Sequence, residues 1–328
     1  MTSPIAHDLE SVTVGDPAYF GGLTIFPLFR DNYLPPEPGY TLLEEAIACG
    51  TARVTEVGKD GSVPELRFEN LGDRPVLLLD GEELIGAKQN RVVNVTILAP
   101  AKQVLVIPVS CVEALRWHAD APDFKPAKHV MYARARAAKA AQVSASMQMG
   151  ASRRSDQSAI WEEIEAKFER LGSASPTQAM DAMYATAAAS IDAYLRAFVW
   201  TERQAGLIFA LGPNNMGLDL MDHPHTMRAL FPKLVRSYAL DAMETPDAAA
   251  VTAGQAAQFL KSTGAAETLV RPAIGIGEEI RLTGHGLTGA ALWAERRCVH
   301  LCAFASNGNG APASFHTRMS RPTRRRAA

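Results

Sequence analysis

The sequence predicts an α+β fold, mostly an antiparallel sheet or sandwich, with a helical insertion in the middle of the chain. Short apolar runs of strand length, rich in Val, Ile and Leu, occur before residue 118 and return after residue 205. Between them, residues 126–200 hold alanine-rich segments and apolar residues at helical spacing. This order lacks the regular alternation of strand and helix that a parallel doubly wound sheet requires.

Length and composition allow one large domain. The 328 residues are 47% hydrophobic, which is enough to bury an extensive core. We expect a single domain over residues 20–306, with the helical part, 126–200, packed on the sheet. Residues 1–19 are expected to form an N-terminal arm. Residues 307–328 are expected to be a disordered basic tail, because Arg318–Ala328 holds five arginines and no acid, and the final RPTRRRAA lacks large apolar residues.

Local patterns predict the elements before residue 76. Residues 23–29 (LTIFPLF) are typical of a strand, and Pro27 favours an edge position because proline donates no ladder hydrogen bond. Residues 41–50 are expected to form a short helix that ends at a glycine. Residues 52–58 and 65–72 are expected to be two strands joined by a turn.

Three apolar runs follow, at 76–79, 92–98 and 104–109, and each has the length of a strand. The turn at 99–102 (APAK) is compatible with a hairpin, so the last two runs are expected to be antiparallel neighbours. The polar residues before the second run and after the third would then lie at the same end of one sheet. We take this end as the candidate site.

These two polar groups offer a defined chemistry. Paired carboxylates and a lysine suit acid–base catalysis, so the candidate catalytic residues are Glu82, Glu83 and Lys88. Basic side chains can hold phosphate, amides suit ribose hydroxyls or a base edge, and tryptophan can stack on a ring. The candidate ligand-binding residues are Gln89, Asn90, Arg91, Asn94, Cys111, Glu113, Arg116 and Trp117.

A plain solvated turn is the competing interpretation. Loops are polar far more often than they are catalytic, and Gly81 and Gly86 suit a turn. Alternation along a strand would also place Arg91 and Asn94 on opposite faces, unless the strand bends or begins after Arg91. The density of amides and charges, with few Ser or Gly between them, favours a site.

The segments GEELIGAKQNRVVN (81–94) and IPVSCVEALRW (107–117) resemble the signature of the ADP-ribosylglycohydrolase-and-rhodanese-phosphatase-associated protein domain family. Weaker similarity continues through SDQSAIWEEI, SPTQAM and residues 217–242, so that the resemblance covers about residues 23–306. The family's name implies a place in the metabolism of NAD and ADP-ribose derivatives. It implies no particular reaction and no catalytic residue.

The later elements are expected to be helical at first and then mixed. Residues 142–158 between the first two helices form either a mobile loop that folds over the site or a plain connection. Helices are expected over 128–149, 158–171, 175–198, 223–243 and 252–263, with β structure over 206–221 and a final hairpin that contains residues 297–303.

Two groups invite a zinc interpretation: His223 with His225, and Cys298, His300 and Cys302, which share one face if 297–303 is a strand. Neither group completes a set of four ligands, and buried inert thiols are common, so no zinc is expected. The sequence does not identify a cofactor, and the one option that it offers is a divalent cation at Glu82 and Glu83.

Charge and hydropathy limit the classes of binding partner and the cellular location that we expect. The net charge is −2, and the basic tail leaves an acidic body, which disfavours general nucleic-acid binding outside that tail. The first residues lack the apolar core of a signal peptide, and no apolar run approaches about 18 residues. We therefore expect no membrane partner and a cytoplasmic location.

The leading functional hypothesis is an enzyme, a hydrolase or transferase, that acts on an NAD-derived nucleotide such as ADP-ribose or a phosphorylated derivative. The alternative is a non-catalytic sensor for a ligand that contains ADP-ribose, and a third interpretation treats the polar residues as a subunit interface. The expected partners are a small nucleotide-like ligand and, further, enzymes that process ADP-ribose. Only the paired glutamates favour the enzyme.

Overall fold

The computed structural model describes residues 4–30, 37–58, 61–118, 121–150, 152–284, 286–307 and 311–312. It confirms the α+β class, with helices packed on mostly antiparallel sheets. Among the described residues, every strand pair is antiparallel except β4 with β7. The expected basic tail lies outside the described residues after Pro312.

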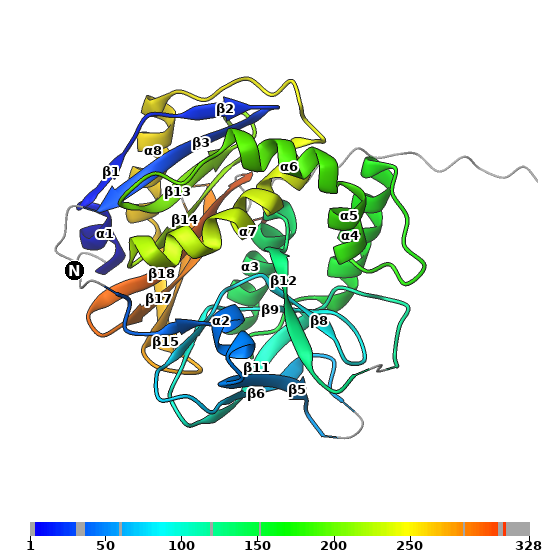
Figure 1. Ribbon diagram of the computed structural model, residues 1–328. Coiled ribbons are helices and arrows are strands. Elements are labelled where there is room, and N and C mark those ends of the chain that lie inside the picture. The colour runs from blue at the N-terminus through cyan, green and yellow to red at the C-terminus, as the bar shows by residue number, and fades with distance from the viewer. Residues whose placement is uncertain are drawn as a thin grey trace, which may run out of the picture.

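The largest sheet forms one side of the molecule and has the order β1-β3-β13-β14-β18-β17-β16-β15, with β2 beside β3 and β19 beside β18 (Figure 1). Its strands are β1 (Val12–Val14), β2 (Ala18–Phe20), β3 (Leu23–Arg30), β13 (Gln204–Ala210), β14 (Met216–Met221), β15 (Glu267–Pro272), β16 (Glu278–Gly284), β17 (Leu287–Ala294), β18 (Arg297–Asn307) and β19 (Ala311–Pro312).

Strand β3 lies inside this sheet, so the edge position expected from Pro27 was wrong. β13 pairs with one side of β3, and β1 and β2 pair with the other side. The carbonyl oxygen of Pro27 accepts from Gly15 N, which is in the gap between β1 and β2. The nitrogen of Pro27, which has no N–H to donate, faces the same gap, where the sheet needs no hydrogen bond from it.

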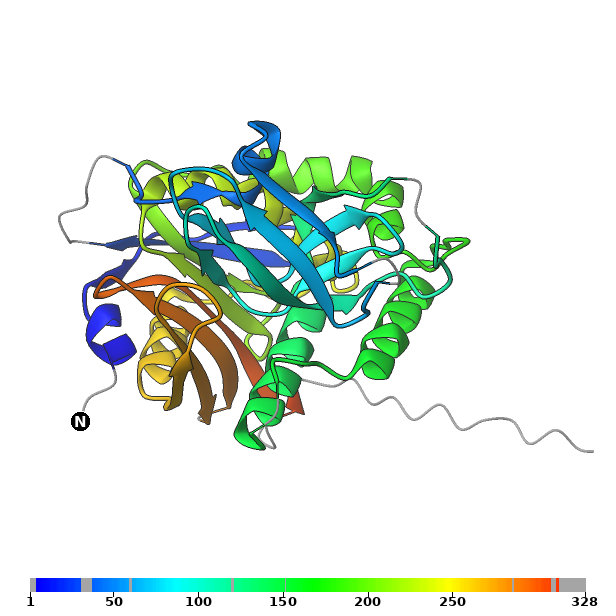
Figure 2. The same cartoon turned by 90° about the horizontal axis from the view of Figure 1, so that it is seen from below.

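A second sheet has six strands in the order β12-β8-β9-β11-β6-β5. An isolated bridge between Thr55 and Asp123 brings its two outer strands together, so the sheet curls into a small barrel. Figures 1 and 2 show these blue to green strands grouped apart from the orange strands of the large sheet. The six strands are β5 (Ala52–Glu56), β6 (Glu65–Asn70), β8 (Glu82–Gly86), β9 (Arg91–Val93), β11 (Val104–Cys111) and β12 (Phe124–Val130).

The barrel is filled by apolar side chains that alternate along its strands. Paired strands contribute them from matching positions, such as Leu66 opposite Ile107 and Val93 opposite Val109. The buried cluster inside the barrel includes Val54, Leu66, Phe68, Leu84, Val93, Ile107, Val109 and Phe124. Side chains on the alternate positions point out of the barrel, and those of β9 pack against helices.

We expected the run 92–98 to form one strand. It forms parts of two short strands, which lie in different sheets. β9 pairs antiparallel with β11, as the predicted hairpin requires, whereas β10 (Ile97–Ala99) pairs with β7 (Val76–Leu78), beside β4 (Thr41–Leu42). The ammonium group of Lys139 donates to the carbonyl oxygens of Val93 and Asn94. These two carbonyl oxygens lie where β9 ends, so they accept from a side chain at the end of the strand's hydrogen-bond ladder.

The helices lie around and between the sheets. Figure 1 shows α7 between the large sheet and the barrel, and it contacts β13 and β12. The expected helix over 175–198 is divided into two, α5 and α6. The helices are α1 (Pro4–Leu9), α2 (Leu43–Ala48), α3 (Ala133–Gln148), α4 (Gln157–Leu171), α5 (Asp181–Thr186), α6 (Ala188–Ala197), α7 (Pro224–Ala242) and α8 (Ala253–Gly264).

The N-terminal residues are packed from Pro4 on and do not form the separate arm that we expected. Ile5 and Leu9 of α1 are 1% and 7% exposed and belong to the buried cluster of the large sheet. Val12–Val14 pair with β3. The sequence pattern missed this packing because a helix of six residues shows too little periodicity to be recognised.

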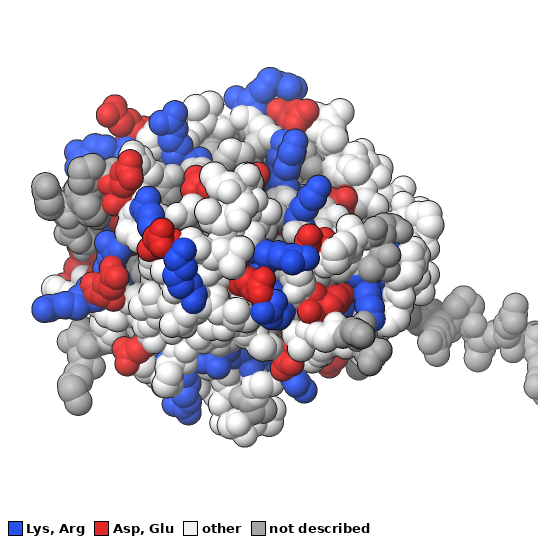
Figure 3. Space-filling view, turned by 60° about the horizontal axis from the view of Figure 1, so that its bottom comes forward, with Lys and Arg blue, Asp and Glu red and all other residues white. Residues whose placement is uncertain are grey.

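The surface carries charges of both signs. Figure 3 shows basic and acidic side chains interspersed over one face of the molecule. None of the described helices is long and apolar enough to cross a membrane.

Candidate functional site at the barrel mouth

The two polar groups predicted from the sequence meet at one end of the barrel. The guanidinium of Arg116 donates to the carbonyl oxygen of Ala87, to Asn90 Oδ1 at 3.2 Å and to Glu113 Oε2 at 2.7 Å. Asn90 N donates to Glu113 Oε2 at 3.0 Å. The turn between β8 and β9 is therefore fixed to the segment that follows β11.

The strand register divides the predicted site between two faces. In the β8–β9 pair, Leu84 lies opposite Arg91, and Glu83 lies opposite Val92. Leu84 belongs to the barrel interior and Val92 to the helix-packed outside. Arg91 consequently points into the barrel mouth, whereas Glu83 points out toward the helices, so the two lie on different faces of the sheet end that we took as the candidate site.

The barrel-mouth cluster consists of Glu56, Gln89, Arg91 and Cys111. Arg91 is fully buried, and its Nη1 donates to Gln89 Oε1 at 3.0 Å. The thiol of Cys111, opposite Arg91 in the ladder, donates to the same oxygen at 3.1 Å. Glu56 accepts from the backbone N–H of Lys88 at 3.3 Å. Glu56 was missed because it lies on β5, more than thirty residues before Arg91.

Several buried polar atoms of this cluster have no hydrogen-bond partner among the described residues. They are Nε and Nη2 of Arg91 and Oε2 of Glu56. Burial lowers the pKa of Arg91 from its usual range, yet a guanidinium remains charged at neutral pH. An unsatisfied buried donor costs about 1–3 kcal/mol, so folded proteins rarely keep such groups without a purpose.

Trp117 lies over the basic side chains of the mouth. Trp117 is 48% exposed, with Lys88 Nζ 5.2 Å and Arg91 Cζ 5.7 Å from its ring centroid. These distances are those of cation–π contacts. The half-exposed ring offers a flat apolar surface next to positive charge.

On the outer face, Glu83 and His129 form a buried pair. Glu83 Oε2 lies 2.7 Å from His129 Nε2, and Asn90 Nδ2 donates to Glu83 Oε1 at 3.4 Å. Burial raises the pKa of Glu83 well above its usual range, and burial lowers the pKa of His129 to about 3. Both shifts favour the neutral form of each side chain.

His129 is positioned by two residues of α5 that sequence reasoning also missed. Its ring stacks on Tyr184 with centroids 3.5 Å apart, and Asp181 Oδ1 lies 3.8 Å from His129 Nε2. The side chain of Asp181 is 41% exposed, so it links the buried pair to the surface. No motif marked His129, because it stands in an ordinary strand segment, FKPAKHV.

Glu82 has a different partner from Glu83. Its Oε1 lies 2.9 Å from Nζ of Lys233 on α7, and the same ammonium lies 2.8 Å from Glu44 Oε2. The two adjacent glutamates are thus engaged on separate elements and are not presented together to a divalent cation. Within the described ranges, no group of three His, Cys, Asp or Glu residues is placed to hold a metal.

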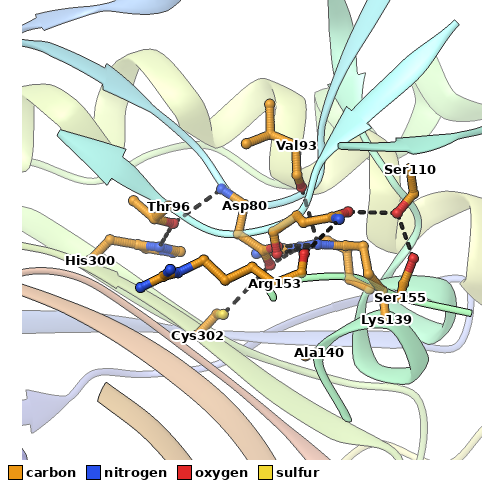
Figure 4. A network of polar contacts seen from close by, with 12 residues as sticks. Asp80, Val93, Thr96, Ser110, Lys139, Ala140, Arg153, Ser155, His300 and Cys302 are labelled. Carbon is orange, nitrogen blue, oxygen red and sulfur yellow. Dashed lines mark hydrogen bonds and ion pairs between the residues drawn. The ribbon is translucent and has the colours of Figure 1, made fainter. Parts of the chain in front are cut away.

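Asn94 lies apart from Arg91 and bonds to Ser110 and Arg153, two residues of the polar network that Figure 4 shows. Its Oδ1 accepts from Ser110 at 2.6 Å, and its Nδ2 donates to the carbonyl oxygen of Arg153 at 3.0 Å. Ser155 lies 2.6 Å from Ser110 in the same network. These contacts fix the segment before α4 against β9 and β11, in the region where a mobile loop was one of our two expectations.

The chain matches one family model, that of the ARG and Rhodanese-Phosphatase-superfamily-associated Protein domain (ARPP-1), over residues 11–304. The chain belongs to the ARPP-1 family. No curated protein and no solved structure matches it. The name of the ARPP-1 domain links it to ADP-ribosylglycohydrolases and to rhodanese phosphatases, and the segments that carried the resemblance form the barrel mouth.

In the ARPP-1 domain, residues 297–303 lie in β18, but Cys298, His300 and Cys302 do not share one face, as regular alternation would place them. A register shift between Leu292 and Trp293 on β17 places a bulge in the pairing, next to Cys298. Cys298 consequently packs into the cluster with Leu301, whereas Cys302 faces the other cluster. The two thiols lie on opposite faces of the sheet because a bulge shifts the alternation by one residue.

Proposed function

We propose that the chain recognises an NAD-derived nucleotide, such as ADP-ribose or a phosphorylated derivative, at the barrel mouth. The observation that carries the proposal is the buried guanidinium of Arg91, whose Nε and Nη2 have no hydrogen-bond partner among the described residues. Two N–H groups on adjacent nitrogens match the oxygens of a phosphate. The unpaired oxygen of Glu56 can accept from a ribose hydroxyl.

Two further features support a nucleotide over a simple anion. The exposed ring of Trp117 beside Lys88 offers a stacking surface for a base. The ARPP-1 name associates the family with ADP-ribosylglycohydrolases. The same association makes enzymes that process ADP-ribose the partners that we propose for the whole chain.

The geometry favours recognition without chemistry over the enzyme. Glu82 and Glu83, the carboxylates on which the catalytic hypothesis depends, do not face the barrel mouth with Arg91. A sensor needs only the mouth, with its free donors and stacking surface. An enzyme would need a conformational change that brings a proton-transfer group to the ligand.

A second candidate function, a hydrolase or transferase of the same nucleotide, is favoured by the Glu83–His129 pair. A neutral buried carboxylic acid beside a neutral imidazole is an arrangement that active sites use for proton transfer. Asp181 would connect this pair to a substrate on the outer face.

Calorimetric titration with ADP-ribose tests the binding proposal. Arg91→Lys keeps the charge and removes the paired N–H donors, so we expect it to weaken binding by about 1.5–3 kcal/mol. Arg196→Lys, on the exposed side of α6, is the matched control and should leave binding unchanged. Equal affinity in the two variants would place the ligand elsewhere.

Incubation of the protein with the same ligand, followed by chromatography, separates the two functions. Binding without a product supports the sensor. A product that no longer forms in Glu83→Gln, with binding retained, supports the enzyme. If the wild-type protein neither binds nor converts the nucleotide, both functions are refuted and the subunit-interface interpretation remains.

A further inference from the structure

A separate pocket of about 310 Å³ lies between α2 and α7, above β7 and β8. Its walls include the side chains of Leu77, Leu79 and Leu230, which are all buried. This volume is at the lower end of the range for small-molecule sites in proteins. The pocket is therefore of a size to hold a compact ligand with an apolar body.

The polar end of this pocket is built from buried charges. Lys233 Nζ is held between Glu82 Oε1 at 2.9 Å and Glu44 Oε2 at 2.8 Å. The side chains of Glu82 and Lys233 are only 3% and 6% exposed, whereas that of Glu44 is 55% exposed and stands at the rim. The second oxygen of Glu82 accepts from Leu79 N at 3.3 Å.

The charges that line the pocket do not balance. Three carboxylates, Glu44, Glu45 and Glu82, stand against the single ammonium of Lys233. The neighbouring glutamates also raise the pKa of Lys233, although burial opposes them, so the lysine remains charged. An anionic ligand would meet net negative charge and would have to displace Glu44 to reach the ammonium. A cation gains attraction, strengthened by the low-dielectric walls.

We propose that this pocket binds a small organic cation, an amine carried on a compact apolar body. The apolar body lies against the leucines, and the ammonium group lies at the rim, where Glu44 and Glu45 provide acceptor oxygens. The site uses none of the residues of the barrel-mouth cluster, so it stands or falls independently of nucleotide recognition.

Three probes with one shared body test this proposal by calorimetry: cyclohexylmethylamine, cyclohexylmethanol and cyclohexanecarboxylate. We expect the amine to bind at least about fivefold more tightly than the alcohol, and the carboxylate to bind most weakly. Glu44→Gln should remove most of the advantage of the amine without changing the affinity of the alcohol. Glu165→Gln, on the exposed face of α4, is the matched control and should change neither.

The location of the site is tested by filling the pocket. Ala229 lines it from an exposed position on α7, so Ala229→Phe should fold normally and abolish binding of the amine. Four results would each overturn the proposal: no probe binds, all three bind equally, the carboxylate binds best, or Ala229→Phe binds the amine as tightly as the wild type.

Discussion

Arg91 is the residue on which the account of the site depends, and its burial changes what its substitution should do. A side chain at an exposed strand end would contribute little to stability. Because the guanidinium is fully buried, Arg91→Ala leaves a cavity and should cost about 2–4 kcal/mol of unfolding free energy. Chemical denaturation measures this loss.

Arg91→Met separates function from stability. It fills most of the same space and removes two buried donors without partners, so the unfolding free energy should stay equal or rise by about 1–3 kcal/mol. Arg136→Met is the contrasting variant, because Arg136 donates two hydrogen bonds to the buried Asp219. Its loss should cost about 3–5 kcal/mol. Strong destabilisation by Arg91→Met would show that Arg91 is structural.

The Glu83–His129 pair predicts a stability maximum at mildly acidic pH. His129 has a lowered pKa, so its contribution is lost as pH falls from about 6.5 toward about 3. Glu83 has a raised pKa, so its contribution is present at pH values below its unfolded value of 4.5 and is lost as pH rises through the folded pKa. The unfolding free energy of the wild type should therefore fall as pH rises above about 6.5, toward the folded pKa of Glu83.

Glu83→Gln tests the assignment of this pH dependence. Glutamine can still donate to His129 and accept from Asn90, but it does not ionise. The variant should lose less stability than the wild type over the same alkaline range, as denaturant titrations at several pH values would report. Parallel curves for the two proteins would mean that another group titrates.

At the scale of the elements, the sequence predicted those with complete local signals. Helix α7 extends from Pro224, after the capping His223, to Ala242, almost as its pattern indicated. The break between β9 and β10 carried no such local signal. The side chain that donates to the carbonyl oxygens there is the buried Lys139, which lies 45 residues after Asn94 in the sequence. Elements stopped by distant side chains cannot be delimited from local patterns.

The packing of α1 predicts that the two chain ends differ in importance. Ile5 and Leu9 are buried, so deletion of residues 1–9 should cost about 3–5 kcal/mol. Deletion of Arg318–Ala328, which has no apolar anchor, should leave the melting temperature unchanged. Calorimetric scans of the two truncated proteins compare them, and equal effects would contradict this difference.

At the scale of the whole molecule, the sequence predicted that two polar groups would meet, but not that they lie on two faces of the sheet or that Glu56 and His129 join them. Sequence spacing indicated that the residues around Arg91 and Glu113 would meet, and hydrogen bonds through Asn90 join them. The period of a strand could not show that the sheet curls into a barrel, nor which face becomes its interior. The register of β8 with β9 separates Arg91 from Glu83, and the closure brings Glu56 to the mouth.

The most direct test of the central claim is the resonance of the Arg91 side-chain Nε–H in a ¹H–¹⁵N spectrum, assigned by its absence from Arg91→Lys. If the unpaired donors of Arg91 receive the ligand, ADP-ribose should shift this resonance and slow its exchange with water. An Nε–H resonance that stays unchanged at saturating ADP-ribose, while other resonances shift, would contradict nucleotide recognition at the barrel mouth.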